Sequence, residues 1–279
     1  MTQTKAVQAM QSDRLTAPAV EAQGLVKTYR GRSGTVEAVR GVDLRVEIGE
    51  IFGFLGPNGA GKSTTVKMLT TLLSITAGTA RIVGVDVATQ PDAVRQRIGV
   101  ALQEAGLDAR QTGRELLVLQ GRLFDLSADA AASRAAELLE LVELTAAADR
   151  MIKSYSGGMK RRLDLASALM HEPEVLFLDE PTTGLDPASR VTVWDEVRRI
   201  NERGTTVFLT TQYLEEADAL CDRLAIIDDG RIVREGTPAQ LKAELTNRLG
   251  LAQEATLDDV FLDATGRTRL AGEVQEVKA

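Results

Sequence analysis

The stretch Gly56-Pro57-Asn58-Gly59-Ala60-Gly61-Lys62-Ser63 fits the pattern G-x-x-x-x-G-K-[ST] of a phosphate-binding loop. Residues 50–55 before it are typical of a buried strand, and residues 63–73 after it are typical of a helix. The glycines allow the backbone N–H groups to form a concave nest for anionic oxygens, and the helix adds the positive end of its dipole. We therefore expect Lys62 to reach the β- and γ-phosphates of a nucleotide and the Ser63 hydroxyl to ligate Mg²⁺. A plain Gly-rich turn, the alternative, leaves the Lys-Ser pair and both flanks unexplained.

Two acidic residues follow an apolar run, Val175 to Leu178, which is typical of a buried parallel strand. Asp179 and Glu180 would then lie at the carboxyl end of that strand, where ligands bind in open α/β sheets. Asp179 fits a carboxylate on the Mg²⁺ side, and Glu180 fits a base that orients the attacking water and takes its proton. Gln103 closes the short apolar run 98–102 in the same way, although a surface glutamine is the default interpretation.

Two further features are each open to two interpretations, and a third residue, the single cysteine, has one. Ser156-Gly157-Gly158 precedes a long helix pattern and reads either as a second anion-binding loop or as an ordinary helix cap. Tyr29 is either an aromatic that stacks on a nucleobase or a tyrosine at a strand edge. Cys221, the single cysteine, permits no intrachain disulfide and reads as a small buried filler.

Bulk composition restricts the classes of protein that remain. The chain has 279 residues, of which 44% are hydrophobic and 26% charged, as in an ordinary soluble globular protein. The net charge of −7 argues against nucleic acid as the main partner, because a phosphate backbone favours a basic surface. No apolar run approaches the roughly 20 residues that cross a bilayer, and residues 1–20 lack the apolar core of a secretory signal. Residues 1–19 are expected to form a flexible tail.

The order of strand and helix patterns predicts an α/β core with additions. Strand patterns at 20–26, 36–39 and 42–46 predict an antiparallel β subdomain. Helical spacing predicts an inserted helical subdomain over about 107–165, whose apolar residues read as internal packing or, alternatively, as a docking face for a partner. A capping-box-like helix start at Thr256 predicts a small helix in a C-terminal appendage.

These motifs, in this order, resemble the ATP-binding cassette (ABC) ATPases over roughly residues 20–245. Residues 56–63 look like the Walker A loop of that family, and residues 175–180 like Walker B with its catalytic glutamate. Gln103 looks like the Q-loop glutamine, which in the family senses Mg²⁺ and water and faces the coupling helices of a membrane subunit. The resemblance implies a P-loop NTPase core, ATPase activity and the cofactors ATP and Mg²⁺.

The resemblance also assigns site residues. It implies catalytic roles for Glu180, Gln212 and Gln103, and metal ligation or sensing for Ser63, Gln103 and Asp179. Tyr29 looks like the aromatic that stacks on adenine, Ser156-Gly157-Gly158 like the signature loop and Asp186 like the D-loop aspartate. The implied nucleotide-binding residues are Tyr29, Gly56, Pro57, Asn58, Gly59, Ala60, Gly61, Lys62, Ser63, Thr64, Ser156, Gly157, Gly158 and Asp186.

The signature loop decides the mechanism that the resemblance implies. In the family this loop contacts the γ-phosphate held by a second subunit, so two copies sandwich two ATP molecules head to tail. A separate integral membrane permease completes the transporter, and the chain would lie peripherally on the cytoplasmic face of the cell membrane. No nucleic acid partner is expected.

One position departs from the family pattern. A histidine usually precedes the segment that begins at Tyr213, and here the residue is Gln212. A glutamine amide donates a hydrogen bond to a phosphate oxygen but cannot take a proton, so we expect Gln212 to position the phosphate and Glu180 alone to act as base. His171, the single histidine, lies between the signature helix and the Walker B strand and is expected to be an exposed loop residue.

The run Thr210-Thr211-Gln212-Tyr213-Leu214-Glu215-Glu216-Ala217-Asp218 is similar to the ATPase subunits of daunorubicin-resistance-type drug exporters, as is Leu257 to Leu262. We therefore expect the ATPase subunit of a drug or antibiotic exporter, with residues 246–279 as an extension that assists assembly or docks on its own domain. An importer, or an exporter of lipid or polysaccharide, would use the same motifs. A soluble ABC protein without a transport role and a catalytically dead cassette are the remaining alternatives, and Lys62, Asp179 and Glu180 argue against the second.

Overall fold

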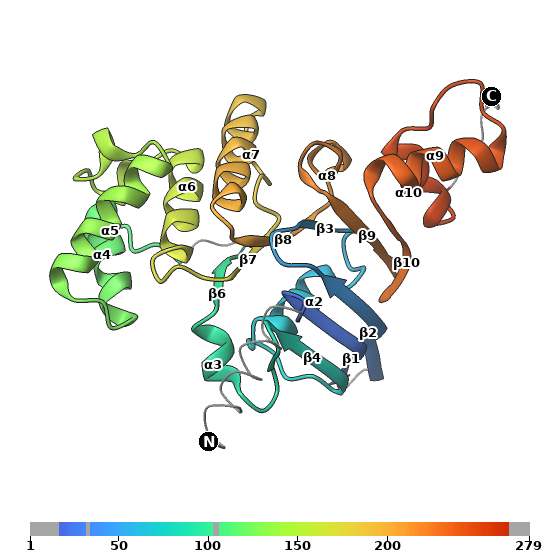
Figure 1. Ribbon diagram of the computed structural model, residues 1–279, viewed down its shortest axis with the longest axis horizontal. Coiled ribbons are helices and arrows are strands. Elements are labelled where there is room, and N and C mark those ends of the chain that lie inside the picture. The colour runs from blue at the N-terminus through green and yellow to red at the C-terminus, as the bar shows by residue number, and fades with distance from the viewer. Residues whose placement is uncertain (1–16, 32–33, 103–105, 268–279) are drawn as a thin grey trace, which may run out of the picture.

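The computed structural model describes residues 17–31, 34–102 and 106–267, and places them in two sheets with helices on both sides (Figure 1). Most of the expected tail, residues 1–16, lies outside the described residues, as do Gln103 and residues 268–279. The inner end of the expected tail is ordered, because Ala19 is 1% exposed and its carbonyl accepts a hydrogen bond of 2.9 Å from the Val83 backbone N–H. A buried apolar residue joined to a strand is part of the folded domain, so the tail expected over 1–19 is too long.

The larger sheet has the strand order β10-β9-β3-β8-β7-β6, and its strands run parallel except for β10, which pairs antiparallel with β9. These strands are β3 (Ile51–Leu55), β6 (Ile98–Ala101), β7 (Val175–Asp179), β8 (Thr206–Thr211), β9 (Arg223–Asp228) and β10 (Arg231–Gly236). Every residue of β3, β7 and β8 is buried, which explains the apolar runs at the centres of these strands. The carboxyl ends of these three strands are adjacent, with β8 between the other two.

The smaller sheet is antiparallel with the order β2-β1-β4-β5. Its strands are β1 (Val20–Gly31), β2 (Gly34–Val46), β4 (Ala77–Ile82) and β5 (Val85–Asp86). The two strands expected at 36–39 and 42–46 are one strand, β2, because Gly41 is an extra residue in the ladder with a φ of 78°. A glycine bulge of this kind bends a strand without ending its pairing.

Helices surround the sheets, and most of them lie at the two ends of the long axis in Figure 1. They are α2 (Lys62–Leu69), α3 (Pro91–Arg95), α4 (Gly113–Leu123), α5 (Ala128–Leu141), α6 (Gly157–Ala168), α7 (Pro187–Glu202), α8 (Leu214–Leu220), α9 (Pro238–Leu249) and α10 (Leu257–Ala264). Helices α4, α5 and α6 form a lobe at one end, at the left of Figure 1, and α9 and α10 lie at the other.

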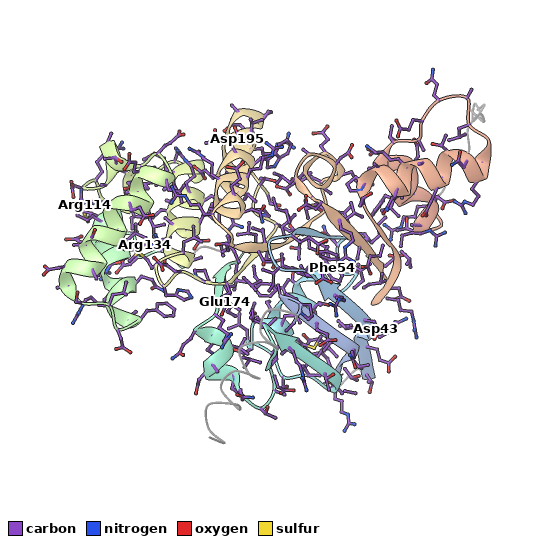
Figure 2. The ribbon with its side chains drawn as sticks, viewed as in Figure 1. Asp43, Phe54, Arg114, Arg134, Glu174 and Asp195 are labelled. Atoms are coloured by element: carbon purple, nitrogen blue, oxygen red, sulfur yellow. The ribbon has the colours of Figure 1, made fainter. Side chains whose placement is uncertain are left out.

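The core has two parts, one on each face of the larger sheet. On one face Phe208 packs with its ring centroid 5.6 Å from that of Phe52, 5.7 Å from Phe54 and 5.3 Å from Phe177. This aromatic cluster, with Phe54 deep in the interior in Figure 2, belongs to the part of the core that packs against the smaller sheet and α2. The opposite face packs leucines of the same strands against the helical lobe, α7, α8 and the C-terminal helices. The α/β core, antiparallel β subdomain and helical subdomain predicted from the sequence are confirmed.

The C-terminal helices belong to the same packed body. Helix α9 continues to Leu249 and ends at Gly250, whose φ of 62° is typical of a glycine cap. The domain boundary expected at residue 245 therefore falls inside a helix and is wrong by several residues. Helix α10 buries Leu257 and Val260, which are 2% and 4% exposed, in the core beside α8 and α9. This supports the interpretation in which the appendage docks on its own domain.

Within residues 17–31, 34–102 and 106–267, no helix has both the length and the apolar character that a membrane span requires.

One buried carboxyl group stands out in the packing of α7 against the helical lobe. Glu196 is fully buried, and neither of its carboxylate oxygens has a hydrogen-bond partner among the described residues. Its nearest cation is Arg162, with Nη1 at 3.9 Å from Oε1. Burial raises the pKa of Glu196 to about 8, so the side chain is largely protonated at neutral pH.

This carboxyl predicts how the stability of the chain depends on pH. Between the ordinary pKa of 4.5 and about 8, the folded chain holds a proton that the unfolded chain has released, so the free energy of unfolding falls as the pH rises. Glu196→Gln removes this loss. We expect its melting temperature to exceed that of the wild type by about 2–4 °C or more at about pH 8.5, and by almost nothing at about pH 5.

The matched control is Glu202→Gln, the same change at an exposed carboxylate at the end of the same helix. It should shift the melting temperature equally at both pH values. A Glu196→Gln variant that melts with the same pH dependence as the wild type would contradict the protonated state.

Candidate functional site

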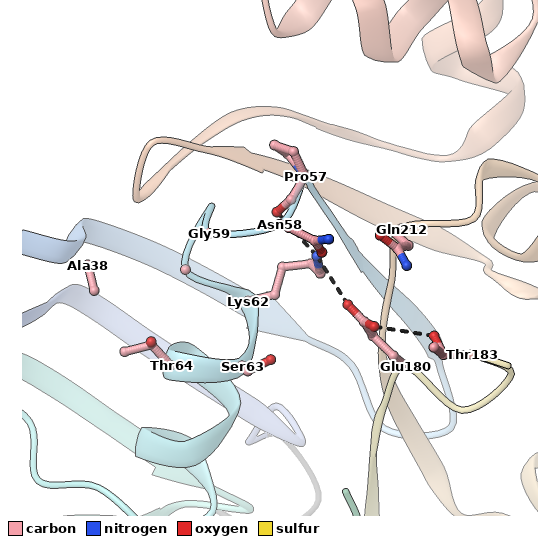
Figure 3. A pocket seen from close by; sticks show the side chains of 11 residues that line it. Ala38, Pro57, Asn58, Gly59, Lys62, Ser63, Thr64, Glu180, Thr183 and Gln212 are labelled. Carbon is pink, nitrogen blue, oxygen red and sulfur yellow. Dashed lines mark hydrogen bonds and ion pairs between the residues drawn. The ribbon is translucent and has the colours of Figure 1, made fainter. Parts of the chain in front are cut away.

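A cleft of about 380 Å³ lies at the carboxyl ends of the central strands (Figure 3). The loop after β3 forms one wall, and residues that follow β7 and β8 form the other. The lining residues are Ala38, Pro57, Asn58, Gly59, Gly61, Lys62, Ser63, Thr64, Glu180, Thr183 and Gln212. The fold thus brings the phosphate loop together with Glu180 and Gln212, which lie more than 100 residues further along the chain.

The phosphate loop has a backbone that only glycine accommodates at key points. Gly59 and Gly61 have φ angles of 82° and 110°, in the left-handed region. A Cβ on Gly61 would lie 2.6 Å from the carbonyl oxygen of Ala38, and a Cβ on Gly56 would lie 2.4 Å from that of Ile227. The loop is therefore pressed against β2 and β9, so its curvature is fixed by its neighbours.

Lys62 opens α2 and is directed along the loop toward the opposite wall (Figure 3). Its Nζ donates hydrogen bonds to the carbonyl oxygens of Gly56 at 2.7 Å and Pro57 at 3.3 Å, and lies 3.5 Å from Oε1 of Glu180. The side chain is only 4% exposed, and burial lowers its pKa, a shift that the charge of Glu180 partly offsets. A buried ammonium at the start of a helix attracts anions strongly, because little water screens it.

Ser63 and Asp179 form a pair of oxygen donors suited to Mg²⁺. The Ser63 hydroxyl lies 3.2 Å from Oδ1 of Asp179, and the Thr210 hydroxyl donates to the same oxygen at 2.5 Å. Asp179 is 3% exposed, so its carboxylate is held in one place. Among the described residues no group of three or more Asp, Glu, His or Cys side chains could hold a metal ion. Mg²⁺ characteristically takes one or two protein oxygens and completes its shell with phosphate and water, and this pair fits that pattern.

Glu180 adopts an unusual backbone conformation at the end of β7. Its φ is 49°, in the left-handed region that residues other than glycine rarely adopt. Its backbone N–H donates to the carbonyl oxygen of Thr210 at 3.0 Å and to the hydroxyl of Thr210 at 3.1 Å. Its carboxylate faces Lys62 through Oε1 and accepts a hydrogen bond of 3.2 Å from the Thr183 hydroxyl through Oε2. The turn directs the carboxylate into the cleft instead of along the strand.

Gln212 is exposed and its side chain lies across the cleft from the phosphate loop (Figure 3). Tyr29 lies on β1, is 41% exposed and is not among the residues that line the cleft. The ammonium of Lys27 lies 5.4 Å from the centroid of its ring. Gln103 lies outside the described residues, so its expected place beside the metal is not described either.

The remaining candidates lie on two helix starts outside the cleft lining. Ser156 caps α6, and its hydroxyl accepts a hydrogen bond of 3.2 Å from the Met159 N–H. Asp186 caps α7 and accepts hydrogen bonds from the Ser189 hydroxyl at 2.5 Å and from the Ser189 backbone N–H at 3.0 Å, and these two bonds lower the pKa of Asp186. The two starts are neighbours, because a Cβ on Gly158 would lie 3.2 Å from the Ser189 hydroxyl. A Cβ on Gly157 would meet nothing within 4 Å, so that surface is open.

His171 differs from the expectation of an exposed loop residue. It is half-buried, stacks on Phe124 with a centroid distance of 3.8 Å, and its Nε2 lies 2.9 Å from the carbonyl oxygen of Ile98. An aromatic ring at the junction of two subdomains fills space there, which explains its burial. Because His171 is the single histidine and is absent from the cleft lining, no imidazole lines the cleft.

Three residues of the site were missed in the sequence. Thr183 and Thr210 hold the carboxylates of Glu180 and Asp179, and Ala38 supports the loop through its backbone. The Thr182-Thr183 pair directly after Glu180-Pro181 was a usable signal, because hydroxyls beside strand-end acids are natural donors. The sequence gives no sign of the role of Ala38, because Ala38 contacts the loop through its backbone carbonyl group, which every residue type has.

The comparisons with known proteins agree with this geometry. The family model described as ABC transporter matches residues 39–183. The daunorubicin/doxorubicin resistance ATP-binding protein DrrA of Streptomyces peucetius is 56% identical over 227 residues, covering 81% of this chain and 68% of the relative. The linearmycin resistance ATP-binding protein LnrL of Bacillus subtilis is 42% identical, covering 83% and 72%. A Nod factor export ATP-binding protein I of Burkholderia lata is 43% identical, covering 87% and 81%.

Solved structures show the same architecture. An ATP binding subunit of an ABC transporter superposes with a TM-score of 0.76 at 27% identity, covering 88% of this chain and 99% of that one. The ATP-binding cassette MJ0796, in a dimeric post-hydrolysis state bound to ADP and Pi, superposes with a TM-score of 0.72 at 27% identity, covering 78% and 98%.

The contact between Gly61 and Ala38 predicts the effect of one added methyl group. Gly61→Ala places a Cβ 2.6 Å from a backbone oxygen and in a strained φ, so the loop must move and its N–H groups lose their convergence. We expect the affinity for ATP, measured by calorimetry or a fluorescent analogue, to fall about tenfold or more, equivalent to about 1.4 kcal/mol.

Gly204→Ala is the matched control, because Gly204 also has a positive φ, of 99°, but meets no atom within 4 Å and lies outside the cleft lining. It should lower stability and leave ATP affinity unchanged. Equal affinity in Gly61→Ala and the wild type would mean that the loop curvature is not what binds the nucleotide.

Proposed function

This chain belongs to the ABC transporter family, and on that premise we propose that it powers an exporter of a drug or an antibiotic as its ATP-hydrolysing subunit. The chain is an ABC ATP-binding subunit and an ATPase. The proposal of drug export rests on the identity of 56% with a daunorubicin/doxorubicin resistance ATP-binding protein. Relatives named for linearmycin resistance and Nod factor export support the same direction of transport.

Glu180 is the proposed general base. A water held between its carboxylate and the γ-phosphate would give up its proton to Glu180 as it attacks phosphorus. Thr183 and Lys62 fix the carboxylate on two sides, so that it does not reorganise during the attack. The buried ammonium of Lys62 stabilises the negative charge on the phosphate oxygens at the same time.

The Ser63 hydroxyl and the Asp179 carboxylate are the proposed holders of Mg²⁺, which would neutralise phosphate charge when bound. Gln103, outside the described residues, remains a proposed third contributor. Gln212 is proposed to donate a hydrogen bond to the γ-phosphate from the opposite wall. Tyr29 is proposed to stack on adenine, and Asp186 to act at the subunit boundary.

The complete pocket is proposed to need two copies of the chain. Ser156, Gly157 and Gly158 lie outside the lining of the cleft in their own chain, and the Gly157 surface is open. An anion-binding helix start that faces outward is suited to close the cleft of a second copy. The dimeric cassette bound to ADP and Pi supports this arrangement.

A separate integral membrane permease is the proposed partner, which would place the chain peripherally on the cytoplasmic face of the cell membrane. A cavity of about 370 Å³ between β6, α4 and α6 offers a docking place. Leu72, 58% exposed, and Phe124 give it an apolar wall, while Arg95 and Asp164 supply charge. Leu102, directly before the position of Gln103, also lines it, so a permease segment there would adjoin the catalytic strands.

The proposed roles predict different phenotypes for two variants. Glu180→Gln keeps the shape of the side chain but removes the base, so ATP turnover should fall by about a hundredfold or more, while ATP holds the chain as a stable dimer. Gln212→Ala removes a phosphate donor and leaves the base, so turnover should fall by about tenfold or more.

ATPase assays and size-exclusion chromatography with Mg-ATP or Mg-ADP measure both effects. A Glu180→Gln chain that stays monomeric with ATP, both in solution and in its membrane complex, would contradict the composite pocket. Unchanged turnover in Gln212→Ala would remove Gln212 from the site without affecting the rest of the proposal.

A further inference from the structure

Arg161 lies on α6, three residues after Gly158, and its side chain points away from the open signature surface toward the main sheet. Its side chain is only 11% exposed, and the guanidinium forms hydrogen bonds with three backbone carbonyl oxygens. A guanidinium carries five N–H donors in a rigid planar fork, so its bonds fix the relative positions of the groups they join.

The three carbonyl oxygens belong to the ends of two catalytic strands. Nε of Arg161 donates to Pro181 at 2.9 Å, Nη1 to Leu102 at 2.5 Å and Nη2 to Asp179 at 3.2 Å. Asp179 and Pro181 are the residues immediately before and after Glu180, while Leu102 directly follows β6. The guanidinium therefore clamps both sides of Glu180 and joins them to the neighbouring strand end.

A fourth contact holds the fork itself. Nη1 of Arg161 lies 3.2 Å from Oδ2 of Asp164, one turn further along α6, where the side chain of Asp164 is 13% exposed. The pair keeps the guanidinium anchored to the helix while its remaining donors reach the strands. Helix α6 and the Glu180 turn are thus joined directly by hydrogen bonds.

We propose that Arg161 is a positioning residue that couples the signature helix of a chain to the catalytic glutamate of the same chain. The left-handed turn at Glu180, with its φ of 49°, needs support from its surroundings, and Arg161 supplies it at the two adjoining carbonyl groups. This inference rests on the proposed function, in which the signature loop touches nucleotide in one pocket while Glu180 serves the other. Arg161 would then couple nucleotide binding at the signature loop in one pocket to the position of Glu180 in the other pocket.

The test separates the position of Glu180 from the assembly of the pocket. In the otherwise wild-type full-length chain, Arg161→Met should lower the single-turnover rate of ATP hydrolysis by about tenfold to a hundredfold, as expected when a reacting group is displaced by about 1 Å. In the Glu180→Gln background, Arg161→Met should leave the ATP concentration for half-maximal dimerisation within about twofold, because the signature and phosphate loops remain intact.

Arg161→Lys distinguishes fork geometry from charge. A lysine keeps the positive charge, but its compact ammonium lacks the planar fork whose spaced donors reach three separate carbonyl oxygens and Asp164 at once. We expect its turnover to stay close to that of Arg161→Met. Full turnover in Arg161→Lys, or unchanged turnover in Arg161→Met, would overturn the inference, as would a loss of dimerisation as large as the loss of turnover.

Arg162→Met is the matched control for folding. Arg162 is the next residue of α6, but its guanidinium donates to the carbonyl oxygen of Val142 in the helical lobe and lies 3.9 Å from Glu196 on α7. Neither partner belongs to the strand ends beside Glu180. It should lower the melting temperature without changing turnover by more than about twofold. If the wild-type chain does not hydrolyse ATP and the Glu180→Gln chain does not dimerise, the proposed function itself is refuted. If the wild type and the Arg161 variants are equally active, only the coupling is refuted.

Discussion

The close packing of the phosphate loop against its neighbours is the constraint on which the rest of the site depends. The backbone between β3 and α2 must curl tightly enough for its N–H groups to converge, and it does so against the carbonyl oxygens of Ala38 and Ile227. Those oxygens come from β2 and β9, so both sheets determine the shape of the loop. The antiparallel sheet is therefore more than a covering layer, because one of its strands forms part of the wall of the nucleotide cleft.

Charge in the cleft is arranged around this loop. Lys62 and Glu180 lie 3.5 Å apart at side-chain exposures of 4% and 10%, where water screens them weakly. Each ion limits the cost of burying the other. The Thr183 hydroxyl also donates a hydrogen bond to Glu180, and the Thr210 hydroxyl donates one to Asp179. A site built in this way holds its charges before substrate arrives, which is what electrostatic stabilisation of a phosphoryl-transfer transition state requires.

The sequence predicted those parts of the fold and site that depend on local pattern. Parallel strands end at one edge of a sheet, so the spacing of apolar runs already placed Asp179 and Glu180 beside Lys62 and Ser63. The bulge at Gly41 and the extent of α9 to Leu249 were not predicted, because strand ladders and helix ends depend on partners far away in the chain. The contacts of Arg161 and the burial of Glu196 and His171 were also invisible. A polar residue in a helix pattern is read as solvent-facing unless its tertiary neighbours are known.

The central claim is that two copies of this chain share each nucleotide pocket, and mixing two inactive variants tests it most directly. Lys62→Ala disables the phosphate loop. Gly158→Asp places a negative charge in the signature loop, and its Cβ alone would lie 3.2 Å from the Ser189 hydroxyl. In a mixed dimer, the intact phosphate loop of one chain meets the intact signature loop of the other. The account predicts that single-turnover ATP hydrolysis reappears on mixing, although each variant alone is inactive. Hydrolysis that stays absent in a mixture shown to contain mixed dimers, or activity in either variant alone, would contradict it.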